Sequence, residues 1–172
     1  FAGSTRYDTS RLVGNYAYSQ GLTPSGVAIV VSGKKYPDAV IGSGLAGIYR
    51  APVLLTTSDS LSQETREAIA FGGVRRVIVM GDTYSVSTAV ESQIKSLGCS
   101  VERVCGSTRQ GTAEAAYRSV PADSWRNTWN AYKTPDYINW TGWKTPGGKK
   151  MAIIVRGDSF PDALSAAPNS AY

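Results

Sequence analysis

The chain has 172 residues and a net charge of +5; 42% of its residues are hydrophobic and 18% are charged. This composition is typical of a folded protein and excludes a disordered chain. The absence of histidine excludes a Ser-His-Asp triad, a histidine general base and His-based zinc sites within this sequence. No apolar run is long enough to span a membrane, and no leader pattern follows Phe1, so we expect any signal peptide to lie outside the sequence.

Short β-branched runs alternate with stretches of helical periodicity along the chain. The expected strands are residues 27–31, 52–56, 76–80, 100–104 and 151–155. The expected helices are residues 7–19, 38–48, 63–71, 87–97 and 110–118. Serines at positions 62 and 87 are suitable N-caps, and glycines at 72, 73 and 98 suit helix ends. This alternation predicts an α/β fold with a mostly parallel sheet and helices on both faces.

Two motifs occur twice in the sequence. The Gly-Ser-Thr-Arg turn at residues 3–6 recurs at 106–109, and the run at 28–39 recurs at 152–163. The second copy is longer between its two motifs, which indicates an insertion within about residues 119–150. The sequence therefore predicts about one and a half copies of a repeat of about 100 residues. The first copy is 1–105; the second begins over 106–172 and carries a Trp-rich insertion at about 121–149, and we expect the chain to be a piece of a longer protein.

The two cysteines, Cys99 and Cys105, flank an expected strand. A disulfide requires Cα atoms within about 7 Å of each other, and an extended run of this length separates them by roughly 20 Å. We therefore expect two free and mostly buried thiols.

Ligands of parallel α/β sheets bind beyond the carboxyl ends of the strands, where helix N-termini attract anions. The expected strand ends are Ser32-Gly33, Thr56-Thr57, Gly81-Asp82, Gly106-Ser107 and Arg156-Gly157. Four carboxylates lie at or near this rim: Asp38, Asp59, Asp82 and Asp162. A pair of them would suit a metal ion or acid–base chemistry, but helix capping and turn formation are the better explanation of these residues.

The repeated arginines, Arg6 and Arg109, each follow a Gly-Ser-Thr turn and precede a helix. A repeated arginine at a repeated turn indicates one repeated task. The guanidinium would either pair internally with Asp38 or Asp162, or bind an anionic polymer.

All four tryptophans lie in the insertion: Trp125, Trp129, Trp140 and Trp143. Aromatic rings among amides and hydroxyls are typical of surfaces that stack on sugar rings. The same rings would also form a small core of their own or pack against a neighbouring module. The basic residues of the insertion are scattered, so we expect no nucleic-acid partner.

Several motifs occur in the same order as in the cell wall binding repeat 2 family, which the sequence therefore resembles. They lie at residues 3–9, 32–39, 51–56, 77–87, 101–106 and 156–168. The resemblance implies an α/β module that occurs as three tandem copies, assembles as a pseudo-trimer and attaches Gram-positive surface proteins to anionic secondary wall polymers. The family's Ile-Leu-Leu segment, implicated in polymer binding, corresponds to Val53, Leu54 and Leu55. Some members accompany an N-acetylmuramoyl-L-alanine amidase domain.

We therefore predict a secreted, non-catalytic module at the cell surface, in the manner of S-layer-type anchoring, with no cofactor and no metal. Its predicted partners are an anionic wall polymer or peptidoglycan-associated glycan, and other copies of the repeat. The alternatives are a wall glycopeptide hydrolase with rim aspartates as acid and base, and an adhesin that uses the aromatic insertion. The predicted polymer-binding residues are Arg6, Ser32, Gly33, Asp38, Arg109, Arg156 and Asp162, with Val53, Leu54 and Leu55 from the resemblance.

Overall fold

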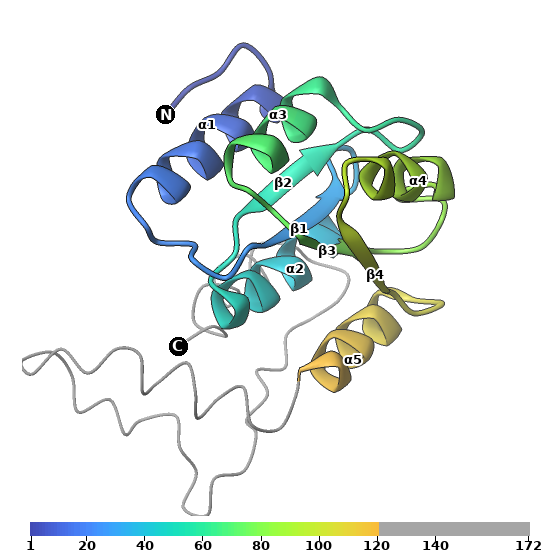
Figure 1. Cartoon of the computed structure of the whole chain (residues 1–172). Coiled ribbons are helices and arrows are strands. Elements are labelled where there is room, and N and C mark those ends of the chain that lie inside the picture. Colours follow the sequence, from blue (N-terminus) through green and yellow to red (C-terminus); the bar gives the residue numbers. More distant parts are fainter. Residues whose placement is uncertain (121–172) are drawn as a thin grey trace, which may run out of the picture.

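A computed structural model describes residues 1–120 of the chain (Figure 1). The elements in order are α1 (Arg6–Ser19), β1 (Val27–Ser32), α2 (Tyr36–Tyr49), β2 (Val53–Thr56), α3 (Gln63–Phe71), β3 (Arg76–Met80), α4 (Thr88–Ser96), β4 (Ser100–Val104) and α5 (Arg109–Ser119). Each strand and helix predicted in this part of the chain is present, with bounds that differ by at most two residues. The expected strand at 151–155 and the aromatic insertion lie outside the described residues.

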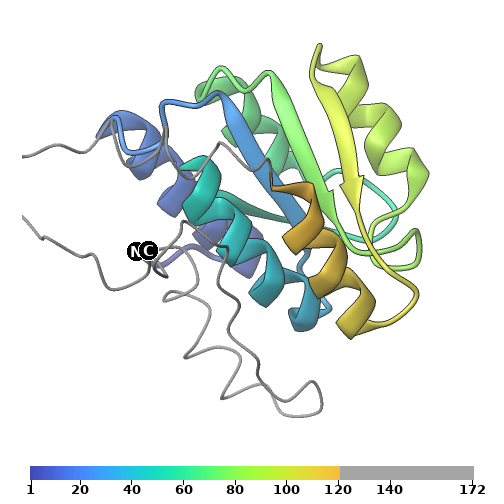
Figure 2. The same cartoon turned by 90° about the horizontal axis from the view of Figure 1, so that it is seen from below.

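The four strands form one parallel sheet in the order β2-β1-β3-β4. The central strand β1 is buried along its whole length because helices cover both faces of the sheet (Figure 2). Helices α1, α3 and α4 lie on one face, and α2 and α5 lie on the other. The predicted α/β class, parallel sheet and two-sided helix cover are confirmed.

Alternate residues of the strands point into two separate cores. Val30 and Val77 pack with α3 and α4, whereas Ile29 and Ile78 pack with α2 and α5. Each of these four side chains is at most 1% exposed. No helix within residues 1–120 is both long and apolar enough to cross a membrane.

Local signals in the sequence account for the helix ends. Ser62 caps α3, its hydroxyl accepting a hydrogen bond from the Thr65 N–H at 3.3 Å. Ser87 occupies the predicted cap position of α4, but its hydroxyl forms no capping bond. Gly73 and Gly98 adopt left-handed φ values of 57° and 84° after α3 and α4, which suits residues without a Cβ.

The two cysteines are free, as predicted, but only one of them is buried. The thiol of Cys99 donates a hydrogen bond to the carbonyl oxygen of Val74 at 3.2 Å. Cys105 is exposed because it follows the end of β4, an edge strand, beyond the cover of the helices. The expectation of two mostly buried thiols is therefore wrong for Cys105.

The two Gly-Ser-Thr-Arg motifs fold in the same way. Thr5 caps α1 at φ −136° and ψ 167°, and Thr108 caps α5 at φ −134° and ψ 169°. The Gly3 N–H donates to the Thr9 hydroxyl at 3.0 Å, and the corresponding bond in the second motif is 3.1 Å long. α5 thus begins as α1 does; the division into one full copy and the start of a second stays a prediction.

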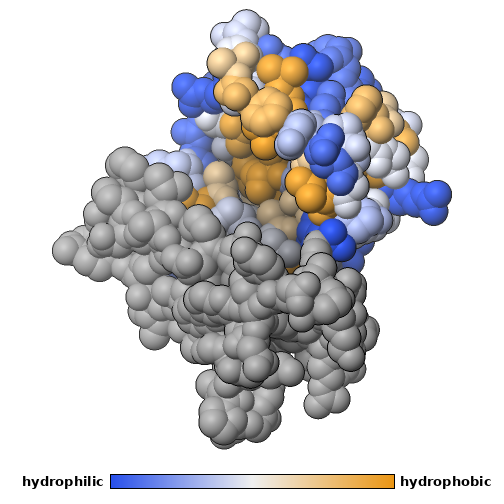
Figure 3. All heavy atoms as spheres, turned by 90° about the vertical axis from the view of Figure 1, so that its left-hand side faces the viewer, coloured by the Kyte–Doolittle hydropathy of each residue, from blue (hydrophilic) through white to orange (hydrophobic). Residues whose placement is uncertain are grey.

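Although they begin alike, α1 and α5 pack differently. α1 lies against α3 and β2, while α5 lies against α2 and β4. On the side of the molecule where α1 lies, apolar side chains gather in a band (Figure 3). Val13 and Tyr16 of α1 are 46% and 47% exposed.

Candidate functional site

The connections of the sheet diverge between β1 and β3. β1 leads to α2 on one face, whereas its neighbour β3 leads to α4 on the other. Such a switch point leaves a crevice at the carboxyl ends of the strands, where α/β proteins bind ligands. An open cleft of about 770 Å³ lies here, bordered also by the loop from β4 to α5. The polar residues lining it include Lys34, Lys35, Asp38, Asp82, Ser85, Ser107, Thr108, Arg109, Gln110 and Thr112.

Asp38 is the most buried charged side chain in this lining, at 8% exposure. It lies in the first turn of α2, whose positive end favours a carboxylate. Its oxygens lie against the tip of β3, since a Cβ added to Gly81 would collide with them. Gly81 has a φ of 90°, so both its backbone and its surroundings require glycine.

Asp82 forms the neighbouring wall of the cleft. Its Oδ1 accepts a hydrogen bond from the Ser85 N–H at 2.9 Å. Some loss of solvation opposes ionisation of the exposed Asp82, but hydrogen bonds from Ser85 and the charge of Lys35 outweigh it and lower the pKa of this carboxyl. Asp82 is therefore a carboxylate at neutral pH, engaged with its own loop.

Positive charge surrounds these carboxylates at the mouth of the cleft. Lys34 and Lys35 are exposed, and neither ammonium forms an ion pair with another described residue. Arg109 is the first residue of α5 and belongs to the same lining. Two helix N-termini, of α2 and α5, also open here. The cleft can thus bind an anion at its mouth.

Arg6 is tied to the rim of the sheet by one hydrogen bond. Its Nη1 donates to the carbonyl oxygen of Gly33 at 2.7 Å. Of the alternatives for Arg6, internal pairing with Asp38 is therefore wrong, because Arg6 contacts the loop backbone instead. Ser32 is buried and its hydroxyl accepts from the Lys34 N–H at 3.2 Å, so both predicted residues shape the β1–α2 loop.

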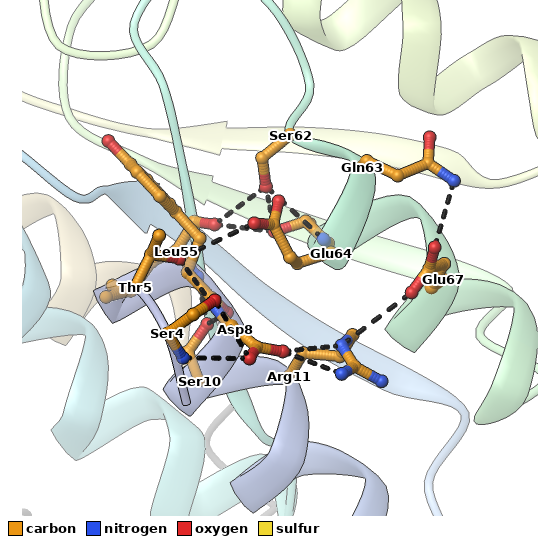
Figure 4. A network of polar contacts seen from close by, with 12 residues as sticks. Ser4, Thr5, Asp8, Ser10, Arg11, Leu55, Ser62, Gln63, Glu64 and Glu67 are labelled. Carbon is orange, nitrogen blue, oxygen red and sulfur yellow. Dashed lines mark hydrogen bonds and ion pairs between the residues drawn. The ribbon is translucent and has the colours of Figure 1, made fainter. Parts of the chain in front are cut away.

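Asp8, the acidic residue of the first motif, is bound by several neighbouring residues (Figure 4). It accepts hydrogen bonds from the Ser4 N–H at 3.1 Å and from Arg11 Nη2 at 2.6 Å. Hydrogen bonding from Arg11, followed by that from Ser4, lowers the pKa of Asp8. Arg11 Nε also lies 3.7 Å from Oε2 of Glu67, and this ion pair links α1 to α3. This network therefore has a structural role.

The segment equated with the family's Ile-Leu-Leu lies in β2. Leu54 is fully buried in the core, so its side chain has no surface to offer a ligand. Val53 and Leu55 are half-buried and pack against the opposite core. A polymer-binding role for them stays a prediction, as it does for Arg156, Asp162 and the four tryptophans, which lie outside the described residues.

The structure thus brings together Asp38 and Arg109 of the predicted site in one cleft, whereas Arg6 contacts Gly33 of the β1–α2 loop and neither of these two residues lines the cleft. Sequence reasoning omitted Lys34 and Lys35 from the site. Their position directly after a strand end was the signal that could have identified them. Between residues 1 and 120, no group of three or more Cys, Asp and Glu residues is arranged to hold a metal ion.

The sequence matches the family described as Cell wall binding domain 2 (CWB2) over residues 1–91. Over 122 residues it is 38% identical to the N-acetylmuramoyl-L-alanine amidase LytC of Bacillus subtilis, covering 71% of this chain and 24% of that protein. It is 31% identical over 171 residues to the amidase enhancer of the same organism, covering 99% of this chain and 20% of that one.

Two solved structures from Clostridium difficile, Cwp6 and Cwp8, share the fold. Cwp6 superposes with a TM-score of 0.65 at 30% identity, covering 72% of this chain and 19% of that one. Cwp8 superposes with a TM-score of 0.60 at 25% identity, covering 70% and 21%. The chain therefore spans about a quarter or less of each relative. Its sequence and its fold agree, and the chain belongs to the CWB2 family of cell wall binding domains.

Proposed function

We propose that this module holds a surface protein on a Gram-positive cell wall by binding an anionic wall polymer in the switch-point cleft. The observation that carries the proposal is two exposed lysines beside two helix N-termini, Lys34 and Lys35, which form no ion pair with any residue of the described part of the chain. Ammonium groups and helix N–H groups both favour phosphate or carboxylate groups. The net charge of +5 attracts such a polymer over a longer range.

We further propose that the module is not itself a hydrolase. LytC carries the name of an amidase, but the match covers only 24% of its length. The runner-up function, hydrolysis with Asp38 and Asp82 as acid and base, would require one carboxyl protonated near neutral pH. The lowered pKa of Asp82 disfavours it as that acid. Release of reducing ends or free amines from peptidoglycan by this chain alone would establish the hydrolase instead.

The double variant Lys34→Ala/Lys35→Ala should weaken retention on purified cell walls by at least about tenfold, because two charge-assisted contacts are lost. Co-sedimentation with walls at low salt measures the effect, and added salt should weaken the unmodified chain in the same direction. Lys95→Ala/Arg118→Ala removes equal charge from exposed helix positions and should leave retention almost unchanged.

Walls stripped of their anionic polymer provide the decisive comparison. The unmodified chain should bind untreated walls and lose that binding on stripped ones. Equal retention on both would overturn the proposed ligand. Loss of binding in the charge-matched control as well would show that net charge, rather than the cleft, holds the polymer.

Other copies of the repeat are the second proposed partner. Ala116 of α5 and Val120, which directly follows this helix, are buried in the core that α2 and the end of β4 share. The corresponding positions on α1 are Val13, which is 46% exposed, and the partly exposed Ala17. Gly14 of α1 is buried and faces Leu54 and Pro52 of its own unit. The outer side of α1 therefore fits the α2–β4 face of another copy, as α5 fits it here.

A charge placed on each helix tests this packing. Ala116→Asp should lower the free energy of unfolding of this chain by about 2–4 kcal/mol, because an unpaired carboxylate would enter the core. Val13→Asp should change it by less than about 0.5 kcal/mol in this chain. In a longer polypeptide that carries further copies, Val13→Asp should become as damaging as Ala116→Asp. Urea titration measures both, and a harmless Val13→Asp in the longer protein would contradict the proposal.

A further inference from the structure

Asp38 is the only buried carboxylate among the described residues, 1–120. It is 8% exposed, yet no hydrogen bond or ion pair links its side chain to any residue of the described part of the chain. A buried carboxylate without partners is costly, and the dipole of α2 offsets only part of that cost. Its position on the wall of the cleft makes it reachable from solvent.

Asp8 provides the matched comparison. Asp8 and Asp38 are each the third residue of a helix, in α1 and α2. Asp8 is bound by Ser4 and Arg11, whereas the Asp38 side chain accepts no hydrogen bond from a serine or an arginine in the described part of the chain. A third-position carboxylate that served as a cap would accept from the N–H of the cap residue, here Lys35, and α2 has no such bond. Helix capping therefore does not explain Asp38.

We propose that Asp38 is a specificity-determining residue of the cleft, which accepts hydrogen bonds from the hydroxyl groups of a sugar unit whose anionic substituent is bound by Lys34 and Lys35. The inference rests on the proposed function and adds to it which wall units the cleft selects. An ionised carboxylate only accepts hydrogen bonds, so it favours donors and repels phosphate. The ligand must therefore place donors deep in the cleft and its negative charge at the mouth.

The geometry of the cleft supports this placement of donors deep in the cleft and of negative charge at its mouth. Asp38 lies against the tip of β3, while the lysines are exposed on the preceding loop. The ligand class is an anionic glycan unit, such as a phosphorylated sugar with free hydroxyls. A bare phosphate chain without sugar hydroxyls would meet the repulsion of Asp38 with nothing to offset it.

Three soluble probes of different chemistry test the inference by calorimetry: inorganic phosphate, glucose 1-phosphate and glucose. The unmodified chain should bind glucose 1-phosphate at least about tenfold more tightly than inorganic phosphate, since charge-assisted hydrogen bonds to Asp38 are added. Asp38→Ala should abolish that preference, while binding of inorganic phosphate stays equal or becomes tighter. Asp38→Asn, which keeps one acceptor oxygen, should retain part of it. Glucose alone should bind more weakly than glucose 1-phosphate.

The control is Asp59→Asn, which removes an exposed carboxylate outside the cleft lining and should preserve the preference. Equal affinity of the unmodified chain for inorganic phosphate and glucose 1-phosphate would overturn the inference, as would a preference that survives Asp38→Ala. Failure of all probes to bind would overturn it too. The wall-retention assay with the Lys34→Ala/Lys35→Ala variant judges the proposed function separately, so the two can fail independently.

Discussion

Replacing Arg103 with alanine should lower the free energy of unfolding by about 3–5 kcal/mol, the largest effect that we expect of a single substitution in the edge strand β4. Arg103 lies on β4, and its Nε donates to Glu91 of α4 at 2.6 Å. Its two terminal nitrogens donate to the carbonyl oxygens of Gly81 at 2.6 Å and Val86 at 2.7 Å. One side chain thus fixes both ends of the β3–α4 loop, which carries part of the cleft.

The cost is large because the pair is shielded from water. The side chains of Arg103 and Glu91 are 16% and 17% exposed, so alanine would leave a shielded carboxylate and two carbonyl oxygens without their donor. Arg118→Ala is the matched control, since its pair with Glu114 is 74% and 61% exposed on one helix. That change should cost less than about 0.5 kcal/mol.

Urea titration of both variants measures the difference, with an unchanged dependence on denaturant showing that the folded state is intact. Arg103→Lys should recover only part of the loss, because an ammonium cannot reach all three acceptors in their fixed directions. Similar costs for Arg103→Ala and Arg118→Ala would contradict the assigned role.

The second large effect concerns Gly81. Gly98→Ala places a Cβ at a φ of 84° with open space around it and should cost about 1–2 kcal/mol from backbone strain alone. Gly81→Ala adds to a similar strain a collision with the Asp38 carboxylate. We expect its total cost to be about 3 kcal/mol or more.

The double variant Gly81→Ala/Asp38→Ala separates the two contributions. Removing the carboxylate should relieve the collision and leave only the strain, so the combined cost should fall below the sum of the single costs. Thermal or urea unfolding of the four chains provides the cycle. Strict additivity would show that Asp38 does not lie against the tip of β3 as described.

Local pattern was sufficient to predict the elements, because short β-branched runs and helix caps are properties of neighbouring residues. The run at 53–56 shows the limit of that information. Its apolar character marked a strand, but which side chain faced the core depended on the helices above it, and Leu54 proved fully buried. The predicted burial of Cys105 was wrong for the same reason, since an edge strand cannot be recognised before the strand order is known.

The site was predictable only in part. The predicted strand ends indicated which loops could form the site. The strand order β2-β1-β3-β4 decides which of these loops lie next to each other, and it places Asp38 beside Gly81 rather than beside Arg6. The three acceptors of Arg103 are brought together by the β3–α4 loop and not by sequence spacing. Long-range contacts of this kind leave no trace in local periodicity.

Helices α1 and α5 begin identically yet settle on opposite layers of the sheet. If each unit lends its first helix to the unit before it, successive units are related by a rotation, and the contact joins two different surfaces. Such head-to-tail contacts either close into a ring or extend without limit. A closed ring of fixed size is the only finite arrangement in which the first helix of every unit packs on a neighbouring unit. Copy number would then be a requirement of folding as much as a means of holding the wall more tightly.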